Sequence, residues 1–147
     1  MGLFDSFRSE VTPNFNPQQA IMTIVIAAVM SDGEVADEEV ARIRSMCLLS
    51  PIFASNSHDQ DLALIRQAIN ANGQMGKQAI SKAAEVLLPE LRETAFAFAC
   101  DMVLADGIVG HSEETFLNSL MSQLGISENA GRGLVWATLV RNRNLYR

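Results

Sequence analysis

Hydrophobic side chains recur at helical spacing along most of the chain, in stretches bounded by residues typical of helix ends. Asn16 with Pro17 predicts a helix start, with an asparagine cap and a proline in the first turn, and Gly33 predicts where this helix stops. Ser57 and Gln60 have the spacing of a capping box. No segment shows the alternation of a strand. The pattern predicts about seven helices, at residues 17–31, 37–50, 57–72, 76–88, 89–105, 112–123 and 127–141.

The two most apolar stretches, residues 17–31 and 89–105, predict the central helices, because a helix that is apolar on most sides belongs in a core. The amphipathic helices that follow them would cover this centre. A chain of 147 residues can bury a single core without additional cross-links. Helical spacing places Met22, Met30, Met46 and Met102 on buried faces. Large aromatic side chains usually form core, so we also expect Phe96, Phe98, Phe116 and Trp136 there.

The pattern Asp-Gly-x-Val-x-x-x-Glu occurs twice, from Asp32 to Glu39 and from Asp106 to Glu113. Each copy lies where one predicted helix passes into the next, so each forms a helix-turn-helix. The distance between the copies exceeds a solenoid repeat of about 20 to 50 residues. We therefore expect an all-α, single-domain bundle with two pseudo-symmetric halves.

Pseudo-symmetry would bring the carboxylates of Asp32, Glu39, Asp106 and Glu113 together. Clustered carboxylates repel one another unless they share protons or hold a cation. Oxygen ligands of this kind favour calcium, magnesium or manganese. Asp101 is a metal candidate of lower rank, because it interrupts an apolar helix where a charge needs solvent or a partner.

A structural interpretation of the repeated motif competes with metal binding. The two glutamates fall in the first turn of a helix, where a negative charge stabilises the helix by about 0.3–1 kcal/mol. The two aspartates could accept a hydrogen bond from the backbone of the turn, with Gly33 and Gly107 supplying its left-handed residue. The residues alone leave both interpretations open.

Composition narrows the functional classes. The chain has 17 acidic and 11 basic residues, a net charge of −6, and no Lys/Arg cluster that would grip phosphates, so we expect no nucleic-acid partner. Arg141, Arg143 and Arg147 are interpreted as a solvated helix end. Cys47 and Cys100 lie in apolar stretches, which predicts buried thiols and a reducing cytoplasm.

The sequence contains no signal for catalysis or for a membrane span. The apolar run at residues 20–30 is shorter than the about 20 residues that a span requires. A glycine-rich phosphate loop and a nucleophile with a matching base are both missing, so we expect no enzyme. The N-terminal segment at residues 1–15, with its Leu3, Phe4 and Phe7, is expected to pack on the domain or to fray.

The residues around the two motifs resemble the acidic signatures of the TerB-like tellurite-resistance family. These residues are Met30-Ser31-Asp32-Gly33-Glu34-Val35 with Glu39 and Leu104-Ala105-Asp106-Gly107-Ile108-Val109 with Glu113. The resemblance implies an all-helical domain at residues 16–147 and a metal role for the four repeated acids. Ala36 and Gly110 depart from the family pattern, which often has a serine or threonine cap there.

We therefore expect a cytoplasmic, non-catalytic module that binds a divalent cation and acts through an unidentified protein partner in stress or tellurite resistance. One alternative is a metal-independent domain that binds a protein or a hydrophobic ligand. A metal-dependent hydrolase is the other alternative, because a carboxylate-bound metal can activate water. The sequence makes no prediction about the oligomeric state.

Overall fold

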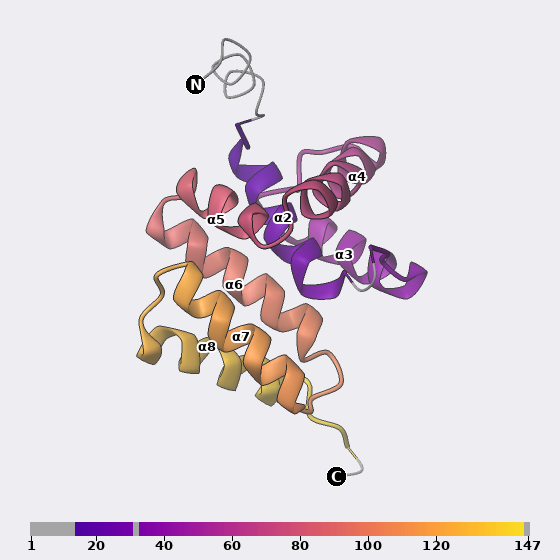
Figure 1. Ribbon diagram of the computed structural model, residues 1–147. Helices are drawn as coiled ribbons and strands as arrows, with labels where there is room; N and C mark the ends of the chain where they lie inside the picture. The colour runs from indigo at the N-terminus through magenta and orange to yellow at the C-terminus, as the bar shows by residue number, and fades with distance from the viewer. Residues whose placement is uncertain (1–13, 31–32, 146–147) are drawn as a thin grey trace, which may run out of the picture.

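The computed structural model describes residues 14–30 and 33–145, and the seven elements within these residues are all α helices. This confirms the predicted all-α fold. The helices are α2 (Pro17–Val29), α3 (Asp37–Leu49), α4 (His58–Met75), α5 (Gln78–Glu85), α6 (Pro89–Val103), α7 (His111–Gln123) and α8 (Glu128–Arg141), as Figure 1 shows.

The predicted starts of α2 and α4 are confirmed by their capping bonds. At the start of α2 the Gln19 amide donates to Asn16 Oδ1 at 2.8 Å, and the Asn16 amide donates to Gln19 Oε1 at 2.9 Å. Ser57 and Gln60 form the same reciprocal pair at the start of α4. Pro89 occupies the first turn of α6. Backbone amides in the first turn have no partner within the helix, so a proline there costs no hydrogen bond. These starts follow from local chemistry, so sequence reasoning could locate them.

Four predicted helix ends differ from the structure by two residues or more. Two of them are those of α5, which ends at Glu85 instead of 88, and α6, which ends at Val103 instead of 105. Helix α2 ends at Val29, and Met30 is already extended with φ −73° and ψ 126°, so the helix stops before Gly33. Helix α4 continues beyond Gly73 to Met75. It continues because the Asn72 side chain donates to the Thr23 carbonyl of α2 at 3.0 Å and to the Ala68 carbonyl at 2.9 Å, which a turn at this point would break.

Helices α2 and α6 form the centre of the domain, as predicted. Residues 20–26 of α2 are all buried, and α2 packs against α4, α5 and α6. Helix α6 also packs against α8, α7 and α3, so it lies between α2 and the pair α7 and α8 (Figure 1). The largest fully buried side chains come from several elements and include Phe53, Phe96, Ile21, Met22, Ile43 and Leu120.

The helices that follow the two motifs both contact α6. Helix α3 packs against α6, and α7 packs against α5 and α6. The main cover of α2 comes instead from α4 and α5. The prediction that the post-motif helices cover the centre therefore holds for α6, whereas α2 is covered by helices from the middle of the chain.

Two aromatic residues lie where the sequence did not place them. Trp136 was predicted to be buried but is 60% exposed on α8, and the Arg143 guanidinium carbon lies 5.5 Å from its ring centroid. Phe15 was assigned to the N-terminal segment, yet it is buried in the core. Leu3, Phe4 and Phe7 lie outside the described residues. No helix in the described part of the chain is long and apolar enough to cross a membrane.

Candidate functional site

The second copy of the motif lies in the connection between α6 and α7. Helix α6 has its C-cap at Leu104, so Asp106 is in the connection between the two helices, as predicted. Asp106 is exposed, and its Oδ1 accepts a hydrogen bond from the Ile108 amide at 3.0 Å. Gly107 has φ 78° and donates its amide to the Leu104 carbonyl at 3.0 Å. Asp106 therefore stabilises a tight turn that only glycine adopts without strain.

The glutamate of the second copy caps α7. Gly110 is the N-cap residue and donates its amide to Glu113 Oε2. Gly110 has no side chain to complete a reciprocal capping box, so Glu113 makes the capping bond from within the helix. Its negative charge in the first turn also complements the helix dipole.

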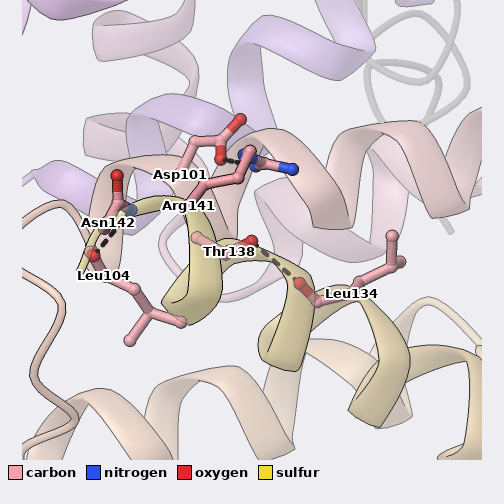
Figure 2. Close-up of polar contacts among 6 residues, drawn as sticks. All are labelled: Asp101, Leu104, Leu134, Thr138, Arg141 and Asn142. Carbon is pink, nitrogen blue, oxygen red and sulfur yellow. Dashed lines mark hydrogen bonds and ion pairs between the residues drawn. The ribbon is translucent and has the colours of Figure 1, made fainter.

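The C-terminal end of α8 contacts this connection, as Figure 2 shows. Asn142 Nδ2 donates to the Leu104 carbonyl at 3.1 Å. A Cβ atom on Gly107 would lie 2.7 Å from the Asn142 carbonyl oxygen, so a larger residue there would displace backbone. The second motif is thus fixed by contacts from three helices.

The first copy lies between α2 and α3 and has fewer contacts within the described residues. Asp32 lies outside the described residues. Gly33 has φ 80°, close to Gly107, but a Cβ atom on it would meet open space. Ala36 is the N-cap of α3 and offers no side-chain cap. The Glu39 side chain is partly buried.

The predicted four-acid metal site remains a prediction, because Asp32 lies outside the described residues. Within those residues, no three or more His, Cys, Asp or Glu side chains form a group that could hold a metal ion, so Glu39, Asp106 and Glu113 alone do not form one. Asp106 and Glu113 each use one oxygen to accept a backbone amide. A carboxylate has about four acceptor positions, so the remaining ones are chemically suited to a hard cation.

Comparison with known protein families identifies the domain that contains these two motif-bearing connections. The family model described as tellurite resistance protein TerB matches residues 18–133, from α2 into α8. The chain belongs to the TerB family. No curated protein and no solved structure gave a match.

Asp101, the lower-ranked metal candidate of this TerB domain, has a partner within the fold. Its Oδ1 lies 2.5 Å from Arg141 Nη2 of α8 (Figure 2). Arg141 and Arg143 are exposed at the end of α8, as expected of a solvated helix end, and in addition Arg141 pairs with Asp101 and the Arg143 guanidinium lies over the Trp136 ring. Arg147 lies outside the described residues.

The two thiols of the TerB domain are free and buried, as predicted. Burial, and to a smaller extent the charge of Asp61, raises the pKa of Cys47 to about 12. Burial and then Asp101 raise the pKa of Cys100 to about 12, against a lowering by Arg141. A thiol with so high a pKa forms little thiolate, so neither cysteine is suited to nucleophilic or redox chemistry.

Sequence reasoning missed one buried carboxylate, that of Asp61 on α4. Asn56 Nδ2 donates to Asp61 Oδ1 at 3.1 Å and to Gln18 Oε1 at the same distance, while Gln18 Nε2 donates to the Ile52 carbonyl at 2.8 Å. This network links the start of α2 to the connection between α3 and α4. The sequence did contain a signal for the burial of Asp61, because this residue shares a helix face with the apolar Ile65 and Ala68.

Proposed function

We propose that this TerB domain is a non-catalytic module that binds a divalent cation through its repeated acidic motif. In this proposal it works in the cytoplasm as an adaptor, acting through a protein partner in tellurite resistance or a related stress response. The observation that carries the proposal is the duplicated motif at residues 32–39 and 106–113 in a chain of the TerB family.

The geometry of the second copy supports a cation role for its acids. The Asp106 turn bond and the Glu113 capping bond fix each carboxylate by one oxygen. Fixed carboxylates lose less conformational entropy on binding an ion than free side chains do. The remaining oxygens are of the type that calcium, magnesium and manganese prefer, and water or backbone carbonyls would complete the coordination.

A metal-independent interaction domain is the second candidate, and the same two bonds favour it. Asp106 and Glu113 already have a structural use, because each satisfies a backbone amide at a turn or a helix start. The motif would then shape two connections without binding any ion. A metal-dependent hydrolase has no such observation in its favour.

Amide substitutions separate the two candidates. Asp106→Asn and Glu113→Gln keep an oxygen that can accept the backbone amide but remove the negative charge that a cation requires. We expect calorimetric titration of the chelator-treated protein with calcium, magnesium and manganese to show saturable binding. The double variant Asp32→Asn/Asp106→Asn should lose this binding and the accompanying rise in melting temperature, while its melting temperature without cation stays near that of the wild type.

Glu38→Gln and Glu114→Gln are the matched controls, because these exposed glutamates lie beside the motif glutamates in sequence. Both controls should retain cation binding. Equal losses in controls and motif variants would indicate a general charge effect. Absence of saturable binding in the wild-type protein would contradict the cation proposal and favour the metal-independent domain.

A further inference from the structure

An apolar groove lies between α3 and α6, and Ala105 from the start of the α6–α7 connection lines part of it. Its volume is about 740 Å³, and it is open along one side. The turn that follows α3 contributes Pro51 and Ile52 to one end, and Asn142 at the end of α8 contributes to another. The groove corresponds to the hydrophobic-ligand or partner site that the sequence left as an alternative.

Both helices direct one face into the groove. On α3 the lining residues Arg42, Met46 and Leu49 are four and then three positions apart, which places them on one face. On α6 the lining residues extend from Thr94 to Met102 at helical spacing, and Ala105 in the connection after α6 also lines the groove. At 1.5 Å per residue the α6 face is about 12 Å long, which matches about two turns of a further helix.

The groove contains apolar surface that the domain itself does not cover. Leu49 lines it and is 85% exposed, and its neighbour Leu48 is 77% exposed outside it. Burying one leucine side chain stabilises an assembly by roughly 1.5–3 kcal/mol. Contiguous exposed apolar surface with a polar rim is typical of a protein interaction site.

The charges at the rim are not balanced. Asp101 lines the groove but is paired with Arg141. Arg42 also lines it, and its guanidinium has no hydrogen bond or ion pair within residues 14–30 and 33–145. The available charge at the groove is therefore positive, although the chain as a whole is acidic. A partner that buries the apolar floor gains most if it presents an acidic group to Arg42.

We propose that the groove between α3 and α6 binds an amphipathic helix of a partner protein, with a leucine-like stripe on the floor and an acidic residue against Arg42. An amphipathic helix presents such a stripe at positions i, i+3, i+4 and i+7. This proposal rests on the adaptor part of the proposed function and is independent of cation binding. It assigns the partner-binding surface to the α3–α6 groove.

A displayed library of 15-residue helices tests the proposal. The library has leucine fixed at i, i+3, i+4 and i+7 and every other position randomised, and it is selected against the full chain in the presence of chelator. We expect the selected peptides to carry Asp or Glu at a position flanking the stripe. Fluorescence anisotropy should show about tenfold weaker binding to Leu49→Asp, as expected for loss of an interface anchor.

Two substitutions sharpen this test. Leu48→Asp is the matched control, because Leu48 is similarly exposed but does not line the groove, and its affinity should change less than about twofold. Arg42→Glu should select peptides with Lys or Arg in place of the acid. Because all three side chains are exposed, melting temperatures of the variants should stay near that of the wild type. Equal binding to Leu48→Asp and Leu49→Asp, or no enriched peptide, would overturn the proposal.

Other occupants give different results. If residues 2–13 of the same chain fill the groove, deleting them raises the affinity of the selected peptides severalfold. If a second copy fills it, sedimentation velocity shows a dimer that Leu49→Asp dissociates. Either result overturns the assignment to an external partner. Retained calorimetric cation binding alongside a failed selection would leave the cation proposal intact.

Discussion

The two copies of the acidic motif have similar turn geometry but different surroundings. Gly33 and Gly107 have φ values of 80° and 78°. A Cβ atom on Gly33 would meet open space, whereas one on Gly107 would lie 2.7 Å from the carbonyl oxygen of Asn142. A repeated motif therefore reproduces a local backbone conformation without reproducing the tertiary contacts around it.

The difference comes from where the later helices contact the central ones. Helix α4 packs on α2, and Asn72 donates to the Thr23 carbonyl in the middle of α2. Helix α8 packs on α6, and Asn142 donates to the Leu104 carbonyl at the end of α6. Of these two contacts, the one made by Asn142 reaches a motif, so a later helix fixes the second motif, whereas the Asn72 contact lies away from the first one.

The glycine substitutions should give the largest difference between the two copies. Gly107→Ala combines a left-handed φ with a backbone clash and should lower the free energy of unfolding by about 3 kcal/mol. Gly33→Ala has the φ penalty alone and should lower it by about 1 kcal/mol. Urea unfolding measures both values. Equal losses would show that the contact with Asn142 does not constrain the second connection.

Substitutions of the two asparagines should have the next largest effects on the free energy of unfolding. Asn72→Ala removes two hydrogen bonds and should lower stability by about 2 kcal/mol, and Asn142→Ala removes one and should lower it by about 1 kcal/mol. Amide hydrogen exchange distinguishes their positions. Asn142→Ala should accelerate exchange at Gly107, whose amide donates to Leu104, and Asn72→Ala should leave this amide unchanged. Faster exchange at Gly107 in both variants would argue against separate contacts.

The motif glutamates should differ by a smaller amount. Glu113→Ala removes the capping bond to Gly110 and should lower stability by about 1 kcal/mol. Glu39→Ala removes only a charge that complements the helix dipole and should lower it by about 0.3–0.5 kcal/mol. Thermal melting without divalent cation measures both. A larger loss at Glu39 would reveal a contact of the first connection that lies beyond the described residues.

The ion pair between α6 and α8 should contribute less. The Asp101 and Arg141 side chains are 38% and 59% exposed. Solvent screens exposed pairs, so a double-mutant cycle with alanine at both positions should give a coupling energy below about 1 kcal/mol. High salt should reduce it further. A coupling energy well above this value would mean that the pair helps to hold α8 against the second connection.

The two thiols, Cys47 and Cys100, should be equally unreactive in the native protein. Neither Cys47 nor Cys100 should react with a thiol reagent at pH 8, whereas both should react in denaturant. Their pKa is raised from 9.0 to about 12, so the folded state keeps protons that the unfolded chain releases. Their stabilising effect is therefore complete below about pH 9 and is lost as the pH rises towards 12. Rapid reaction at pH 8 in the native protein would contradict this.

Local signals made much of the fold predictable. The capping residues Asn16 and Ser57 and the glycine at 107 act within a few residues of their own position, so their pattern revealed helix starts and a turn. The end of α4 was missed because Asn72 bonds to α2, a contact between residues far apart in the sequence. The candidate site was predictable only in part. The turn role of Asp106 and the capping role of Glu113 were among the expected alternatives, whereas the cluster of four acids stays a prediction.

The sequence by itself determined the all-α class, the central position of α2 and α6, the burial of both cysteines and membership of the TerB family. These properties follow from hydrophobic periodicity and short motifs, which depend on neighbouring residues. Only the tertiary structure decided that Arg141 pairs with Asp101, that Trp136 is exposed, and that a groove with Arg42 at its rim lies between α3 and α6. Such features depend on how helices far apart in the chain pack together, and no local pattern specifies that packing.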